Sequence, residues 1–256
     1  MPARDKVPSN AVGMTDGLDP AKEIPGRSYT AEDADRLVES FNADAQGGAN
    51  TRYRSWEHCY RYFKQHRSKP DEETLDLLSL HLAFYLASWG MYRGSSFLLQ
   101  KDYRAHKEAV KEIVKRKYGC LWGMSAKQML KADHLELILS VSQKLKELYR
   151  AEKTGLSKPP AVTDTLITKI LMGTFGCVPA YDQYFLNGMK AYHAASGAFG
   201  EKSLRSLAEY YIENKDVFND CRDRISKNGL EYPQMKILDM CFWQIGFELT
   251  SAPRTT

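Results

Sequence analysis

The sequence predicts an all-α fold. Val and Ile together account for only 18 of the 256 residues, so strand-forming residues are too few for a large sheet. Between turn signals the chain is rich in Leu, Ala, Lys, Glu and Met, which favour helices, and its apolar residues recur at helical spacing. We therefore expect a compact bundle of about ten helices.

The N-terminal region differs in composition from the rest. Residues 1–27 hold four of the ten prolines together with three glycines, and they show no periodicity. This composition is typical of a flexible arm. We expect residues 28–256 to form a single all-α domain, arranged either as one bundle or as two helical lobes with a cleft.

Three helices are predicted in the first part of this domain. Thr30 is a candidate N-cap for the first, which should end in the Gly-containing run Asp44–Asn50. A second helix carries apolar residues at helical spacing from Trp56 to Phe63. A third, preceded by the acidic run Asp71–Glu73, extends over Leu75–Trp89 and is apolar nearly all round, which predicts a central position.

The remaining elements follow from the same signals. Ser95–Gln100 predicts another turn or two of helix, and Gly155–Pro160 a sharp connection. Pro179, as a first helical residue, should open a helix that runs to about Tyr192. Further helices are expected at about 104–117, 126–150, 163–174, 202–211, 216–227 and 233–247.

The net charge of +4 is unevenly distributed. Residues 52–69 contain six Lys and Arg against one acid, and residues 101–158 contain fourteen against seven. The remainder of the chain is therefore acidic. Two basic stretches of this kind fit either a surface that binds a polyanion or ordinary solvated helix faces.

Several classes of protein are excluded. No apolar run reaches the roughly 18 residues that a membrane-spanning helix needs, and no signal-peptide-like stretch opens the chain, so we expect a cytoplasmic protein without a membrane partner. The five scattered cysteines and six histidines show no disulfide framework or metal-ligand spacing. Walker A and GxGxxG motifs are absent, so no nucleotide cofactor, and no cofactor of any other kind, is predicted.

The most informative segment is residues 158–182. It predicts a Pro-bearing turn, a short amphipathic helix, a Gly-containing loop, and a second helix with Asp182 in its first turn. The unpaired N–H groups of a helix N-terminus can hold a phosphate. An acid at the start of the next helix would be held on a rigid element at the edge of a cleft.

This segment resembles the helix-hairpin-helix DNA glycosylase superfamily, in the branch of endonuclease III and 8-oxoguanine glycosylase. Pro160-Ala161-Val162-Thr163 matches the hairpin of that family, and Val178-Pro179-Ala180-Tyr181-Asp182 matches its acidic stretch, giving a helix-hairpin-helix-like element near 156–190. Ala161 and Thr163 replace the two hairpin glycines, and one extra residue precedes the acid.

The resemblance implies a DNA glycosylase that hydrolyses the N-glycosidic bond of a flipped base and leaves an abasic site. Asp182 would stabilise the oxocarbenium charge and orient or deprotonate the attacking water. The Schiff-base lysine of bifunctional members falls near Thr165, and Lys169 follows one turn later. We therefore expect a monofunctional enzyme with Asp182 and Lys169 as its catalytic residues.

DNA contacts are expected from two parts of the chain. Trp89 and Tyr92 are candidates for stacking on a base, with core packing as the alternative for Trp89, and Arg93 and Gln100 are candidates for a wedge or a phosphate contact. The glycines that flank Tyr92-Arg93 favour a shaped turn. From the matching segment we expect DNA or substrate contacts by Lys158, Thr163, Thr165 and Tyr181.

The substrate is either a damaged base, in repair, or a modified base of bacteriophage DNA, in antiviral defence. The altered hairpin and the turn Trp-Gly-Met-Tyr-Arg-Gly at 89–94 favour the second, because they suggest a pocket unlike those for common lesions.

Two alternatives compete with a glycosylase. Arg61 and His66 have the Arg-x4-His spacing of HEPN-type ribonucleases, which are also all-α. The chain could instead be a non-catalytic helical module that binds nucleic acid. His81, in the apolar helix, is expected to be a hydrogen-bonded core histidine.

Overall fold

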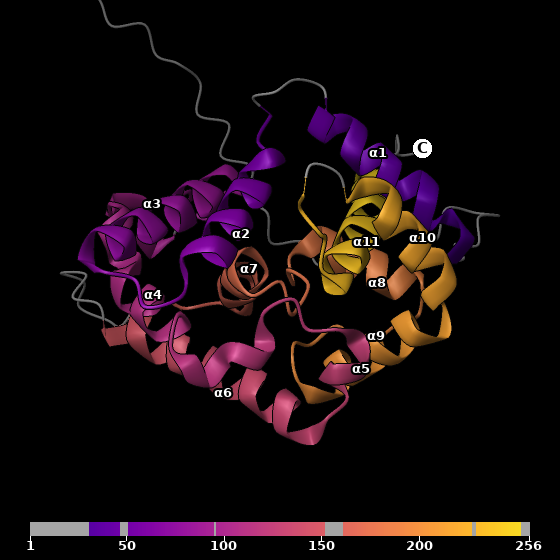
Figure 1. Ribbon diagram of the computed structural model, residues 1–256. Coiled ribbons are helices and arrows are strands. Elements are labelled where there is room, and N and C mark those ends of the chain that lie inside the picture. Colours follow the sequence, from indigo (N-terminus) through magenta and orange to yellow (C-terminus); the bar gives the residue numbers. More distant parts are fainter. Residues whose placement is uncertain (1–30, 47–50, 95, 152–160, 227–228, 252–256) are drawn as a thin grey trace, which may run out of the picture.

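The computed structural model describes residues 31–46, 51–94, 96–151, 161–226 and 229–251. The expected arm (1–27) and Lys158 lie outside these ranges. The described residues form helices and turns with no strand, which confirms the all-α prediction (Figure 1). Ten of the eleven α-helices in these ranges have seven or more residues.

The helices follow in chain order. The α-helices are α1 (Ala34–Gln46), α2 (Arg54–His66), α3 (Glu72–Ser88), α4 (Lys107–Ile113), α5 (Ala126–Met129), α6 (Ala132–Ala151), α7 (Asp164–Thr174), α8 (Gln183–Ala191), α9 (Glu201–Glu213), α10 (Lys215–Ile225) and α11 (Gln234–Ser251). The described 3-10 helices are η1 (Ala31–Asp33), η2 (Phe97–Gln100), η3 (Tyr103–His106) and η4 (Arg116–Leu121).

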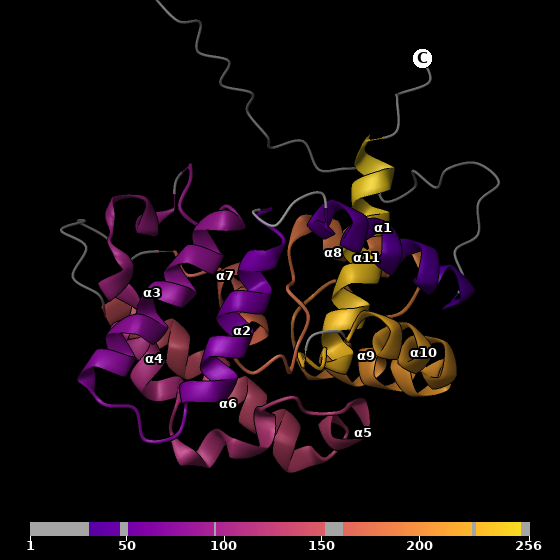
Figure 2. The same ribbon diagram turned by 45° about the horizontal axis from the view of Figure 1, so that its top comes forward.

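The helices lie in two groups (Figures 1 and 2). Helices α2, α3, α4, α6 and α7 pack together on one side, and α8, α9, α10 and α11 pack together on the other. The N-terminal helix α1 packs on α11 and α10, so it belongs to the group formed mainly by the C-terminal half. Contacts of α5 and α6 with α9 join the groups along one edge.

Two long predicted helices are interrupted, and one is longer than expected. The predicted helix at 104–117 is replaced by η3, α4 and the start of η4, and the extended backbone of Lys115 (ψ 138°) separates α4 from η4. The predicted helix at 126–150 is divided after α5, where Lys131 N and His134 Nδ1 both bond to Gln128 O. Helix α1 continues to Gln46, past the predicted end at Asp44.

The expected central helix is also corrected. Helix α3 buries one face, but Leu77, Leu80 and Phe84 are exposed on its outer side. The fully surrounded segments are instead Leu166–Thr174 of α7 and Met235–Gly246 of α11, in which every residue is buried. The apolar residues on all faces of α3 therefore indicated correctly that it packs in the core. The most enclosed helices, however, are α7 and α11.

Helices α8 and α11 cross at two glycines. A Cβ atom on Gly188 would overlap the backbone carbonyl of Phe242, and one on Gly246 would overlap that of Tyr184. The two helices approach each other closely because both positions lack a side chain. This contact fixes the start of α8 against α11.

We expect Gly188→Ala to destabilise the protein by about 3 kcal/mol or more, because the backbone of α11 cannot move aside as a flexible side chain could. Denaturant unfolding measures the change. The control is Gly119→Ala, where nothing lies within 4 Å of the added methyl and stability should change by less than about 0.5 kcal/mol. Equal unfolding midpoints for the two variants would contradict this account of the helix crossing.

Candidate active site

The connection between α7 and α8 is buried and tightly bonded. Residues 175–181 are all buried. Ala180 N donates to Asp239 Oδ1 (2.9 Å), Tyr181 N donates to Thr168 Oγ1 (2.9 Å), and Thr165 Oγ1 donates to Tyr181 O (2.9 Å). Side chains of α7 and α11 thus hold this segment in one path, and that path determines where Asp182 lies.

Asp182 is the N-cap of α8, not a residue of its first turn. Its backbone is extended (φ −92°, ψ 175°), and its Oδ1 accepts a hydrogen bond from Phe185 N (3.1 Å). The expected helix start at Pro179 is therefore wrong. Pro179 lies in the buried connection, whose N–H groups are bonded to side chains of other helices.

Lys169, which is buried, and Asp182, which is partly exposed, form an ion pair. Lys169 Nζ lies 3.1 Å from Asp182 Oδ2 and donates a second hydrogen bond to Trp89 O, also 3.1 Å. The side chains are 5% and 14% exposed. The structure thus brings together three of the residues selected from the sequence, from α7, the start of α8 and the end of α3.

Four aromatic rings pack beside this pair; we call them the aromatic cluster: Phe41, Tyr53, Trp89 and Trp243. The Phe41 and Trp89 rings are parallel, with centroids 6.2 Å apart. Tyr53 and Trp243 stand nearly perpendicular to both of these rings and to each other, at 5.1–6.2 Å. The cluster joins the two groups of helices, because Phe41 and Trp243 come from α1 and α11 and Trp89 from the end of α3.

The cluster contains unused hydrogen-bond donors. The indole Nε1 atoms of Trp89 and Trp243 are buried and have no hydrogen-bond partner in the described ranges. Buried polar groups are nearly always paired, and an unpaired one costs about 1–3 kcal/mol. Two such donors in one aromatic cluster are suited to a planar ligand that carries hydrogen-bond acceptors.

A second ion pair, fully buried, also lies near Trp89. Lys236 Nζ is 2.7 Å from Asp239 Oδ2, and the two side chains are 5% and 7% exposed. The ammonium lies 5.0–5.9 Å from the ring centroids of Phe41, Trp56 and Trp89. Lys169 Nζ also lies 5.7 Å from the Trp89 ring, so two cations contact one indole.

Both carboxylates act on one buried tyrosine. Burial raises the pKa of Tyr85 well above its usual range, and the negative charges of Asp239 and Asp182 raise it further. Asp239 and Asp182 are 57 positions apart in the sequence, and both are near enough to Tyr85 for their charges to act on it.

Sequence reasoning missed half of this site. Lys236 and Asp239 are one helical turn apart within an otherwise nearly uncharged run of α11, and charges in such a run were the available signal. Nothing in the sequence indicated that Phe41, Tyr53 and Trp243 belong to the site, because aromatic residues at helical spacing are usually ordinary core residues.

Arg52 lies at the outer side of the aromatic cluster. Its guanidinium is 5.2 Å from the Tyr53 ring centroid and 5.7 Å from that of Trp89. Tyr53 and Trp89 are partly exposed, whereas Phe41 and Trp243 are buried. The accessible side of the cluster therefore carries a positive charge.

The other residues selected around Trp89 lie on the surface or in a separate network. Gly90 and Gly94 have φ of +76° and +59°, which fits the expected shaped turn. Arg93 is exposed and folds back over Gly90. Gln100 is exposed at the end of η2. Tyr92 is hydrogen-bonded through its hydroxyl to His106 Nε2 (2.7 Å) rather than presented for stacking.

The residues selected in the matching segment have mainly structural contacts. Thr163 is the N-cap of α7 and accepts from Leu166 N, so the helix start predicted there is confirmed. Thr165 bonds to the α7–α8 connection. Tyr181 is buried and hydrogen-bonded to Ser203 (2.8 Å), which corrects the expected DNA contact.

The residues of the ribonuclease alternative do not meet. Arg61 and His66 are five positions apart on α2, which places them about 140° apart around the helix. The His66 ring packs at a tilt against Tyr62 (centroids 4.3 Å apart), and the His81 ring stacks on the same tyrosine (4.0 Å). His81 is partly exposed, so the core histidine is His106 instead.

No protein-family model matches the chain, and neither the curated proteins nor the solved structures include a significant match. Among the described residues, no helix combines the length and apolarity needed to cross a membrane. In the same ranges, no three His, Cys, Asp or Glu side chains gather so that they could hold a metal ion.

The buried network Tyr92–His106–Tyr149 makes stability depend on pH. His106 is bonded at Nε2 and Nδ1 to the two tyrosine hydroxyls, and burial lowers its pKa to about 3. Below about pH 6.5, His106 binds a proton in the unfolded chain but stays neutral in the native protein. Stability should therefore fall with falling pH, by up to about 1.4 kcal/mol per pH unit from this group.

The measurement is denaturant unfolding of the wild type and of His106→Gln from pH 7 to pH 5. The wild type should lose stability more steeply than the variant, whereas His58→Gln, at an exposed histidine, should follow the wild type. Parallel curves for the wild type and His106→Gln would refute the assignment.

Proposed function

We propose that this protein is a monofunctional DNA glycosylase, which hydrolyses the N-glycosidic bond of a flipped base and leaves an abasic site. The observation that carries the proposal is the Lys169–Asp182 pair beside an aromatic cluster with two unpaired indole N–H groups. This arrangement supplies a carboxylate, a proton donor and a surface for a planar base in one place.

Asp182 supplies the charge that this reaction needs. As the bond between sugar and base breaks, positive charge develops on the sugar, and a fixed carboxylate stabilises it. Because the Asp182 Oδ1 caps α8 and Oδ2 faces Lys169, the carboxylate is held in one orientation. It can also accept a proton from a water molecule that attacks the sugar carbon C1′.

Lys169 completes the transfer of protons. The base departs with the electron pair of the broken bond and needs a proton, which the ammonium of Lys169 can donate. Asp182, having taken a proton from the attacking water, can return one to Lys169 at 3.1 Å. The sum is addition of one water molecule, with OH on the sugar and H on the base.

The aromatic cluster supports recognition of the base. A base would enter past the partly exposed Tyr53 and Trp89, and the unpaired indole N–H groups would donate to its acceptor atoms. Arg52, at the outer side, is suited to the phosphate next to the flipped nucleotide. The exposed basic residues of 52–69 extend this positive surface around α2.

The substrate class is a damaged base or a modified base such as those of bacteriophage DNA. We favour the modified base, for a role in defence, because the altered hairpin and the turn at 89–94, with glycines of positive φ at 90 and 94, differ from what the resembled family uses for common lesions. The following experiment distinguishes damaged from modified bases by comparing DNA substrates of both kinds.

We expect Asp182→Asn to reduce base release by about 100-fold or more, the usual contribution of a positioned acid or base. Asn caps a helix as well as Asp, so the substitution removes the charge while keeping the start of α8. Base release and alkali-labile sites are measured on DNA with uracil, with oxidised bases, and with hydroxymethylated or glucosylated cytosine.

Asp71→Asn is the matched control. Asp71 caps α3 in the same way, through Thr74 N (2.8 Å), but it is exposed and forms no ion pair with a lysine in the described ranges. The control should release bases at the rate of the wild type. A fully active Asp182→Asn, or activity on RNA that disappears in His66→Ala, would reject the glycosylase proposal.

The same geometry predicts that no Schiff base forms. Lys169 already donates to Asp182 and Trp89 O, so its nitrogen is engaged as an ammonium rather than free for attack on C1′. Borohydride added during turnover should trap no covalent adduct with DNA. An adduct that is absent in Lys169→Gln would show instead that the enzyme is a bifunctional lyase.

A further inference from the structure

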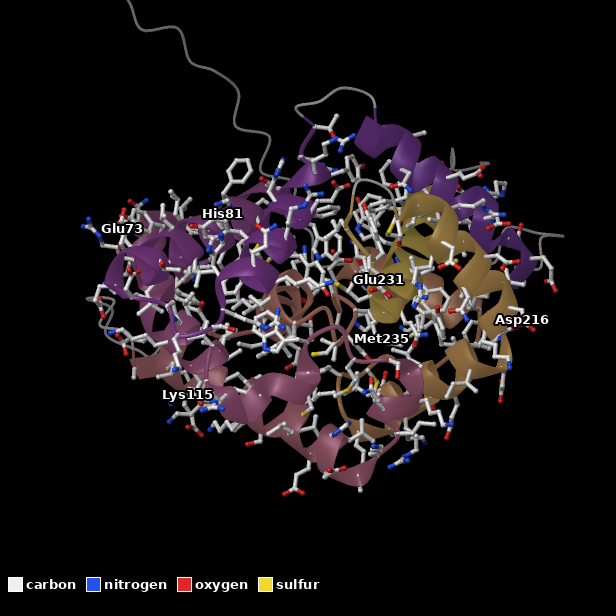
Figure 3. All side chains as sticks on the ribbon, in the orientation of Figure 1. Glu73, His81, Lys115, Asp216, Glu231 and Met235 are labelled. Atoms are coloured by element: carbon white, nitrogen blue, oxygen red, sulfur yellow. The ribbon has the colours of Figure 1, made fainter. Side chains whose placement is uncertain are left out.

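A separate pocket lies between the end of α2 and the start of α11. Its volume is about 240 Å³, and Glu231, on its rim, is at the front of the second helix group near the middle of Figure 3. The pocket is lined by the last turns of α2, the turn at 122–125, Arg222 of α10 and residues 231–234. None of the residues proposed for catalysis lines it.

The lining is strongly basic. Three basic side chains line the pocket, those of Lys64, Arg67 and Arg222, against one acidic side chain, that of Glu231. Neither Lys64 nor Arg67 has a salt bridge to an acid within the described ranges, and Arg222 has one, to Asp223 at 3.6 Å. Such an excess of unneutralised cations around one hollow is suited to an anion.

Arg222 and Arg67 leave donors available to a ligand. Arg222 Nε is buried and has no hydrogen-bond partner in the described part of the chain. Arg67 stacks on the Trp122 ring at 4.8 Å and uses Nη1 to bond with Lys64 O (2.7 Å), which fixes its plane and leaves its other N–H groups free.

Further donors come from the floor of the pocket. Tyr60 is buried except toward this pocket, and its hydroxyl makes no hydrogen bond to the described residues. Burial raises the pKa of Tyr60 to about 12, so the hydroxyl keeps its proton as a donor. Pro233 and Gln234 also line the pocket, so the N-terminus of the 18-residue helix α11 adds its positive end.

We propose that this pocket binds a phosphate group. Guanidinium groups, an ammonium, a phenol and a helix N-terminus are together the donors that a tetrahedral oxyanion uses. The phosphate belongs either to a free phosphorylated compound or to the DNA backbone beside the proposed active site. Tyr60 stacks on Trp56, whose ring lies 5.1 Å from Lys236 Nζ, so two rings separate the pocket from that buried lysine.

The proposal is tested by binding, so it can succeed or fail independently of base release. Isothermal titration calorimetry with inorganic phosphate should show saturable binding to the wild type. Arg222→Gln and Lys64→Gln should each weaken it about tenfold or more, through loss of charge-assisted hydrogen bonds. Lys64 is exposed, so Lys64→Gln gives an answer even if Arg222→Gln unfolds. Arg116→Gln, at an exposed arginine outside the pocket, is the control and should bind as the wild type does.

The anisotropy of a short labelled DNA duplex, measured over a range of salt concentrations, identifies the source of the phosphate. If the pocket holds a backbone phosphate, both substitutions should weaken duplex binding and reduce its salt slope by about one. If it holds a free compound, they should weaken phosphate binding alone. The proposal is overturned if neither substitution changes phosphate or duplex binding, or if Arg116→Gln weakens both equally.

Discussion

The structure depends on one carboxylate, that of Asp239. Its Oδ2 neutralises Lys236 inside the core, and its Oδ1 accepts the N–H of Ala180 in the α7–α8 connection. A single side chain of α11 thus both allows a buried lysine and fixes the segment that ends at Asp182. Lys236 and Asp239 lie one turn apart on α11, so the pair is formed within this helix, and the hydrogen bond from Ala180 N to Asp239 couples α11 to the α7–α8 connection.

Glycine contacts allow this assembly. Gly188 and Gly246 let α8 and α11 approach through their backbones, and Gly173 does the same for α7 against the ring of Tyr85. Gly176, with φ of +69°, turns the chain at the end of α7 where a side chain would overlap Pro233. The close approach of Lys169 and Asp182 therefore depends on backbone packing at these glycines as much as on the attraction between the two charges.

The sequence predicted elements whose signals are local, and it failed where the cause was distant. The helix start at Thr163 and the turn between the two glycines that flank Tyr92-Arg93 depend on signals within a few residues, and both were predicted correctly. Pro179 has the local signal of a helix start, but Asp239 and Thr168 hold the following N–H groups and delay the helix to Gln183. Asp182 and Lys169 could be selected from the sequence, whereas the aromatic cluster draws on residues from 41 to 243, which no local pattern connects.

Stability alone does not explain the composition of this core. A buried ion pair is often no more stabilising than apolar residues of the same size, because removing two charges from water costs about as much as their attraction returns. This protein nevertheless places two lysine–aspartate pairs, one fully buried and one partly exposed, against one indole, with both lysines on helices that carry few other charges. It also leaves two indole N–H groups unpaired among the same rings. These features contribute little or nothing to stability compared with a simple apolar core, and all of them meet where α1, α3, α7 and α11 come together. Such a concentration of polar groups in a core is what the proposed function would require at that point, and the surrounding glycine and aromatic packing supplies stability that the polar groups do not.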